Sequence, residues 1–317
     1  MKKLSFFFIF ISLFSLAFTF GCLDNGLSFD GSSSFGKGQI NGTVLLNGKA
    51  GTTLNLVSEQ NSQIGFKIKN VGQKEMTNVT GRLIGCLPSE NEEGEEIIAT
   101  EEVIPPNGQS FLVWDVEALK LSQSEELTCF DIIRICYNYE STGLTELKFV
   151  PEDYSGEPEV ANTADGSDML DYEFQFGTTR VLEDGNEVNG AIYLRNNGAG
   201  WIDYTNYNNN KKINHLTKLN LAISGEGVGF SQIGDKEIEP IEKNLTFSLD
   251  TESDNYVGKD YEYLLKFVQG KEDYIRTEMK VNEPDLFQDS PETRTLTVTA
   301  EHGYCVDVAT VAINMRG

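Results

Sequence analysis

The chain has 317 residues, with 25 Lys and Arg against 49 Asp and Glu, and a net charge of −24 at pH 7. So acidic a surface repels phosphate backbones and anionic headgroups, which argues against nucleic-acid binding and against a basic membrane-binding patch. The length is sufficient for two domains.

The chain opens with a segment typical of an export signal. Lys2 and Lys3 precede an apolar run over residues 4–20, which is followed by Gly21 and Cys22. The Gly-Cys pair resembles the cleavage site of lipoprotein signals, which implies removal of residues 1–21 and a lipid anchor on Cys22. An uncleaved membrane anchor and plain secretion remain alternatives, because the apolar run is near the lower limit for crossing a bilayer. All three predict export, and the lipid-anchored form would lie on the extracellular face of the membrane.

The next segment, residues 22–38, is rich in Gly, Ser and Asp and is expected to be a flexible tether. Beyond it the pattern predicts short strands. Ile64, Phe66 and Ile68 alternate with polar residues, as in a strand with one buried face. A turn-rich stretch then precedes another alternating segment at 111–116.

Residues 130–150 are expected to form a hairpin that turns around Ser141-Thr-Gly143. We therefore expect the first β domain to cover residues 39–151. An acidic segment poor in apolar residues, 152–171, is the expected linker.

The second half of the chain, 172–317, repeats the pattern of the first. Three matches occur in the same order: 65–73 with 190–200, 77–85 with 217–225, and 104–115 with 238–250. A shared order of this kind favours a duplicated module of the all-β class. The fold expected is two tandem immunoglobulin-like β-sandwiches.

The strand end Lys69-Asn70-Val71-Gly72, the strand start at 77–80 and the corner at 105–108 carry a family resemblance. Together they resemble the cell-adhesion-related (CARDB-like) immunoglobulin-type modules of archaeal and bacterial surface proteins. The resemblance implies extracellular display, a role in adhesion, spacing or assembly, and no catalytic residues.

Four cysteines remain when Cys22 is set aside, an even number that suits disulfides in an oxidising exterior. Cys86 ends one predicted strand and Cys129 begins another, and antiparallel neighbours would bring them together. We therefore favour a Cys86–Cys129 bond. Cys136 and Cys305 would then be buried thiols or a bridge between the modules.

A recognition loop is predicted at residues 201–210, where the second module carries extra residues. Trp201, Tyr204 and Tyr207 lie there among several asparagines, and aromatic faces with amides suit a glycan or protein ligand. The alternative is that Trp201 closes the core. Trp114, on an alternating strand, is expected in the core.

The sequence also contains candidate modification and metal sites. Asn41, Asn78 and Asn244 begin Asn-x-Thr sequons, which are candidate glycosylation sites if the host modifies exported chains. The acidic residues Asp165, Asp168 and Asp171 could form a calcium site in the linker, although a solvated loop is the simpler interpretation. No other cofactor or metal is expected.

No serine-nucleophile motif, phosphate-binding loop or paired-cysteine zinc pattern occurs in the sequence. We therefore expect a non-enzymatic surface-anchored structural, adhesion or assembly protein. Its expected partners are the membrane, other cell-surface proteins or glycans, and further copies pairing through edge strands. The alternative function is a surface lipoprotein that binds a ligand through the 201–210 loop.

Overall fold

The computed structural model describes most of the chain beyond residue 39. The described residues are 33–34, 40–87, 98–156, 169–182, 186–202, 204–206, 211–213, 215–249, 262–266 and 272–317. The predicted leader, Cys22, and most of the predicted tether and linker lie outside them. None of the helices in these residues is long and apolar enough to cross a bilayer.

The described chain is built from β-strands, which confirms the all-β prediction. One sheet has the order β1-β2-β5-β8, with β3 paired to β2. Its strands are β1 (Ser33–Ser34), β2 (Ile40–Leu46), β3 (Lys49–Ala50), β5 (Asn61–Asn70) and β8 (Gln109–Glu117). Ile64, Phe66 and Ile68 on β5 are fully buried, as their alternation predicts.

A second sheet has the order β10-β12-β20-β17-β18. Its strands are β10 (Leu170–Phe176), β12 (Glu187–Asn196), β20 (Glu272–Val281), β17 (Val228–Ile233) and β18 (Lys236–Glu242). These strands pair antiparallel, and β10 buries Leu170, Tyr172, Phe174 and Phe176 on one face.

The third and largest sheet runs β19-β16-β21-β9-β6-β7. These strands are β19 (Asn244–Ser248), β16 (Leu216–Ile223), β21 (Glu292–Arg316), β9 (Glu126–Pro151), β6 (Met76–Ile84) and β7 (Ile98–Ile104). Three short strands, β4 (Thr53–Val57), β11 (Thr179–Val181) and β13 (Trp201–Ile202), join it. The remaining elements are β14 (Tyr204–Asn206), β15 (Lys211–Ile213) and the 3-10 turns η1 (Glu262–Leu265) and η2 (Pro284–Phe287).

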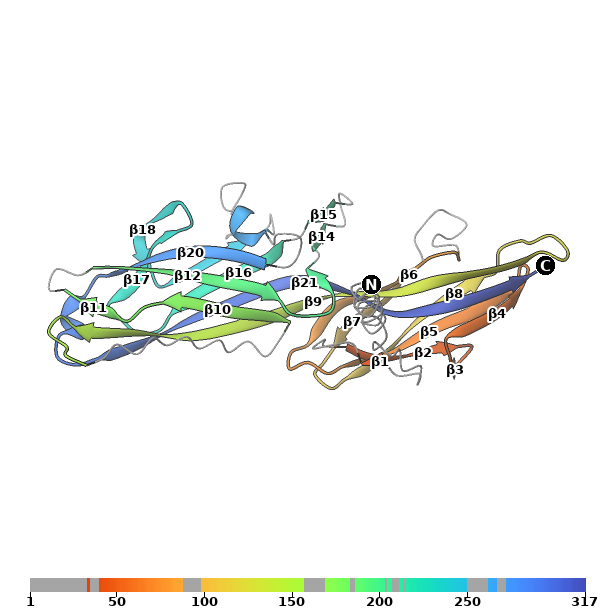
Figure 1. Ribbon diagram of the computed structural model, residues 1–317, viewed down its shortest axis with the longest axis horizontal. Helices are drawn as coiled ribbons and strands as arrows, with labels where there is room; N and C mark the ends of the chain where they lie inside the picture. Colours follow the sequence, from red (N-terminus) through yellow and green to blue (C-terminus); the bar gives the residue numbers. More distant parts are fainter. Residues whose placement is uncertain are drawn as a thin grey trace, which may run out of the picture.

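The strands β9 and β21 run along the elongated molecule as an antiparallel pair (Figure 1). They have 26 and 25 residues and pair from Glu126 with Arg316 to Phe149 with Glu292. The predicted hairpin at 141–143 is therefore wrong, because these residues continue β9. The glycine that suggested a turn instead leaves room for a neighbour: a Cβ on Gly143 would lie 2.3 Å from the ring of Tyr172.

Two lobes share this long pair. In the first lobe, the β2-β5-β8 sheet packs on the part of the large sheet that contains β6. The indole of Trp114 on β8 donates a hydrogen bond to the carbonyl of Gly81 on β6, and Trp114 is buried as predicted. In the second lobe, β10 packs on β9 through Tyr172 and Gly143. Each lobe is therefore sandwich-like.

The two lobes share part of their strand order, as the first two sequence matches suggest. β5 lies between β2 and β8, β12 lies between β10 and β20, and each ends on an asparagine that organises the next turn. Asn70 accepts from the N–H of Gly72 and donates to the carbonyl of Lys74. Asn196 accepts from the N–H of Gly198 and donates to the carbonyl of Gly200, with the same spacings.

The end of the chain returns to the first lobe. β4 pairs in parallel with β21 at residues 312–316, and β11 pairs in parallel with β9 at residues 149–151. Each of the two long strands, β9 and β21, therefore contributes to both lobes. The predicted linker at 152–171 separates the two halves of the sequence. The largest sheet nevertheless contains strands from both halves, so the sheets are not divided at this linker. The third sequence match, 104–115 with 238–250, does not join equivalent strands. β19 pairs with β16 as β7 pairs with β6, so the structural counterpart of β19 is β7 and not β8.

Candidate functional site

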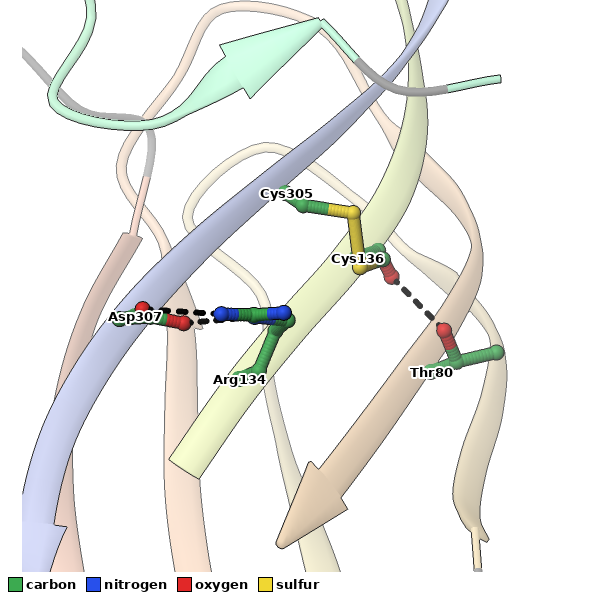
Figure 2. The surroundings of a disulfide bond; sticks show 5 residues. All are labelled: Thr80, Arg134, Cys136, Cys305 and Asp307. Carbon is green, nitrogen blue, oxygen red and sulfur yellow. Dashed lines mark hydrogen bonds and ion pairs between the residues drawn. A yellow bond between two sulfur atoms is a disulfide. The ribbon is translucent and has the colours of Figure 1, made fainter. Parts of the chain in front are cut away.

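A disulfide, an ion pair and a cation–π contact lie close together around residues 134–136 of β9 and 305–307 of β21, where these strands pass from one lobe to the other; we call this region the waist. Cys136 and Cys305 are direct partners in the antiparallel register and form a disulfide (Figure 2). Their Cα atoms are 4.1 Å apart, and the bond closes 169 residues of sequence separation. Of the two alternatives expected for these cysteines, the structure has the bridge between modules.

An ion pair lies beside this disulfide. Arg134 on β9 donates from Nε to Oδ1 of Asp307 at 2.7 Å and from Nη2 to Oδ2 at 3.1 Å (Figure 2). This fork geometry fixes both side chains and is stronger than a single contact. The register of the pair shifts between Asp307 and Ala309, so the ladder has an irregularity next to the ion pair.

The same guanidinium covers the predicted recognition residue Trp201. The Arg134 carbon Cζ lies 4.7 Å from the centre of the indole ring, a cation–π contact. Trp201 begins β13, where it pairs with Cys305 of β21. One face of its ring is thus used inside the molecule, which fits a structural role at the waist. Tyr207 and the side chain of Tyr204 lie outside the described residues.

A tight turn carries Trp201 to this position. The hydroxyl oxygen of Tyr304 accepts a hydrogen bond from the N–H of Gly200 at 2.5 Å. A Cβ on Gly200 would lie 2.0 Å from the carbonyl oxygen of Cys305, so only glycine fits here. Burial raises the pKa of Tyr304 to about 12, and the Gly200 N–H offsets part of that rise. Tyr304 is therefore a neutral structural group at physiological pH.

A buried aromatic cluster continues from Tyr304 into the second lobe, and it includes His302. The rings of Tyr137 and Tyr304 are 5.8 Å apart, and the rings of Tyr139 and His302 are 6.2 Å apart. Burial raises the pKa of Tyr137 well above its usual value, and the neighbouring tyrosines Tyr304 and Tyr139 add to this. Its hydroxyl donates to the sulfur of Met169 at 3.2 Å.

His302 is fully buried and neutral. Burial lowers the pKa of His302 to about 4, and the backbone of Ala300 and Tyr139 offsets only part of this effect. Neither ring nitrogen has a hydrogen-bond partner of good geometry. A catalytic histidine needs a nucleophile or carboxylate within hydrogen-bond reach, so this environment suits packing rather than proton transfer.

The predicted disulfide between Cys86 and Cys129 is confirmed, and a buried acid supports it. The bond joins residues next to β6 and on β9, which are antiparallel neighbours. Asp131 is fully buried, and its Oδ1 accepts from the N–H groups of Cys86 at 2.6 Å and Leu87 at 3.3 Å. Burial raises the pKa of Asp131, and these two donors oppose the rise. Sequence reasoning missed Asp131, although a single acid in the apolar run 130–137 was a usable signal.

A second buried acid and an exposed aromatic pair lie on β20 of the second lobe. Asp273 accepts from the N–H of Tyr274 at 2.7 Å, and burial raises the pKa of Asp273 to about 7. Tyr274 is 48% exposed, and its ring lies 4.9 Å from that of Tyr193 on the outer face of the sheet. Arg195 lies over Tyr193 and forms an ion pair with Glu173. Such cross-strand pairs stabilise a sheet.

The predicted modification and metal residues are only partly described. Asn41, Asn78 and Asn244 are all exposed, so each is accessible to a modifying enzyme. Asp171 lies on β10 and accepts from the side-chain amide of Asn197, whereas Asp165 and Asp168 lie outside the described residues. No cluster of three or more His, Cys, Asp or Glu suited to a metal occurs in the described part of the chain.

Comparisons with known proteins give this chain no family. No family model matches it, and no curated protein matches it. Among solved structures, the secreted serine protease VesC from Vibrio cholerae aligns with 80% of this chain at 9% identity, with a TM-score of 0.17. The chain spans about half of that structure (49%). A TM-score this low carries no argument about fold or activity.

Proposed function

We propose that the protein is a non-catalytic, lipid-anchored surface protein in which two immunoglobulin-like sandwiches form one stiff body for adhesion or spacing. The observation that carries the proposal is the shared pair of β9 and β21. A paired ladder passes from one lobe to the other, and the Cys136–Cys305 bond crosses it at the waist. Such a join resists bending between lobes better than a single linking segment does, because paired strands bend only by straining their hydrogen bonds.

The two disulfides support the exported location. Disulfides persist in oxidising compartments outside the cytoplasm and are rare inside it. All four cysteines of the mature body are paired, and the remaining one, Cys22, is the residue that the leader would present for lipidation. The resemblance to CARDB-like modules supports the same role. The asparagine turns at Asn70 and Asn196 support the duplication on which that resemblance depends.

Intact mass of the membrane-extracted chain, with and without reduction and alkylation, tests this function. We expect loss of residues 1–21, an added lipid mass, and four cysteines that react with alkylating reagent only after reduction. Cys22→Ala is the matched control and should lose the lipid mass while keeping both disulfides. Recovery of the uncleaved chain from the cell interior with free thiols would contradict the proposal.

A further inference from the structure

The strand β8 is an open edge in the first lobe. It is the last strand of its sheet and, among the described residues, pairs only with β5. At its two ends, the N–H of Asn70 donates to the carbonyl of Gly108, and the N–H of Ala118 donates to the carbonyl of Gln60. The N–H and C=O groups of the even-numbered residues of β8 therefore point toward β5. By alternation, Gln109, Phe111, Val113 and Asp115 direct their N–H and C=O groups to the open side.

The same odd-numbered residues form the exposed face of β8. Phe111 is 56% exposed and Val113 is 49% exposed. The ammonium of Lys67, on β5, lies 5.8 Å from the centre of the Phe111 ring. The edge therefore presents unpaired backbone groups beside an aromatic and a β-branched side chain, which is the combination that favours addition of another strand.

Other edge strands carry features that oppose such pairing. β18 has the sequence KEIEPIE, with a proline and three glutamates. β7 carries Glu101 and Glu102, and β10 carries Asp171 and Glu173 on its polar face. Charges and proline on an edge are the usual protection against association. Among the described edges, β8 stands apart because its exposed centre is apolar.

We propose that β8 pairs antiparallel with β8 of a second copy of this chain, around a two-fold axis at Leu112. This register joins Phe111 to Val113 of the second copy, and Val113 to Phe111, as two aromatic–aliphatic cross-strand pairs. It also joins Gln109 to Asp115 of the second copy. All of these residues have open backbone groups, so each pair exchanges two hydrogen bonds.

The charges along β8 are compatible with a second copy in this register. No acid lies opposite another acid, because Asp115 meets Gln109 and Glu117 meets Asn107. Lys69 pairs with Gln109 across β5 and β8, so it lies in the same cross-strand row as Asp115 of the second copy. Two strand spacings separate that lysine and that acid, about 10 Å between backbones, which long side chains shorten. The attraction partly offsets the repulsion between two chains of charge −24.

This inference deepens the proposed structural role by naming its partner as the same protein, but its test does not depend on lipidation or location. The purified full chain carrying both Gln109→Cys and Asp115→Cys is treated with a short bis-maleimide in solution, and non-reducing gels report cross-linked dimer. Within one chain these positions are about 20 Å apart, too far for the reagent. Across the proposed axis they are adjacent.

We expect the double-cysteine chain to give dimer, and the parent and the Gln109→Cys chain to give only background. Adding Val113→Lys should lower the dimer yield about tenfold, since it removes the aliphatic partner of Phe111 from both cross-strand pairs and puts a charge in its place. Val103→Lys, at a valine on β7 with 42% exposure, is the matched control and should leave the yield unchanged.

Two outcomes would overturn the inference. They are background yield from the double-cysteine chain and equal yield from Gln109→Cys alone. A failure of export with the dimer intact would instead count against the proposed function only.

Discussion

At the scale of single residues, two buried titratable groups in the second lobe respond to acid in opposite ways. Burial lowers the pKa of His302 to about 4, below its unfolded value of about 6.5. As pH falls through that window the unfolded chain binds the proton first, so stability is lost. Burial raises the pKa of Asp273 to about 7, above its unfolded value of about 3.9. There the folded chain binds the proton first, so stability is gained as pH falls.

Substituting each group should therefore reveal its own contribution to the pH dependence of stability between pH 7 and pH 5. Relative to the parent, His302→Phe should become more stable at pH 5 than at pH 7 by about 2 kcal/mol. Asp273→Asn should change in the opposite direction by about 2–3 kcal/mol. Urea unfolding at the two pH values measures both differences.

Comparison with the parent at each pH is the control, because it cancels the titration of the chain's many exposed acids. A difference between variant and parent that stays constant from pH 7 to pH 5 would show that the group keeps its ordinary pKa in the folded protein.

At the scale of elements, the sequence was sufficient to predict strands whose pattern is local. It was not sufficient where packing against a distant segment determines the conformation. Alternation at Ile64, Phe66 and Ile68 was enough to predict β5 and its buried face. The Cys86–Cys129 bond followed from strand order. The turn predicted at Gly143 was wrong because glycine is common in turns, whereas here it makes room for Tyr172. Tyr172 lies on a strand that begins 27 residues later in the chain.

The packing against Tyr172 predicts the effect of adding one methyl group to β9. Gly143→Ala places a Cβ 2.3 Å from the Tyr172 ring and should lower the free energy of unfolding by about 1–3 kcal/mol. Gly65→Ala on β5 is the matched control, because the nearest atom to its Cβ lies at an ordinary 3.5 Å. Denaturant unfolding compares the two.

A double variant separates this contact from a general intolerance of β9. Gly143→Ala should cost less in a Tyr172→Leu background, where the ring is absent. Equal costs with and without the ring would contradict the proposed reason for the glycine.

At the scale of the whole molecule, the exchange of long strands was not predictable from local pattern. The two modules were visible through their repeated turns at Asn70 and Asn196. Nothing in the alternation of 304–316 distinguishes a strand of the second lobe from one that returns to β4, about 260 residues earlier. The contact between Arg134 and Trp201 at the candidate site was not predictable either, because the pairing of β9, β21 and β13 brings these two side chains together.

Deleting residues 308–317 should therefore disturb the first lobe, although these residues are the last of the chain. The deletion removes the partner of β4 and uncovers the start of β9, while Cys305 and Asp307 stay. Amide hydrogen exchange of β4 and β6 should accelerate about tenfold or more, with β12 and β16 little changed.

Arg316→Ala, at an exposed position, is the control and should leave exchange unchanged. Adding a peptide of residues 308–317 should restore protection in β4. Exchange that accelerates only in β12 and β16 would mean that the end of β21 serves the second lobe.

The return of β21 also sets the order in which the protein can be completed. Synthesis proceeds from the N-terminus, so β2 to β8 emerge long before residues 304–316, which complete the first lobe. Until then β4 and the first half of β9 present unpaired edges, which is the state that chaperones hold and proteases remove. The first lobe cannot close before residues 304–316 are made, so a chain truncated before them keeps these edges exposed. The fold thereby makes closure of the first lobe depend on the synthesis of β21.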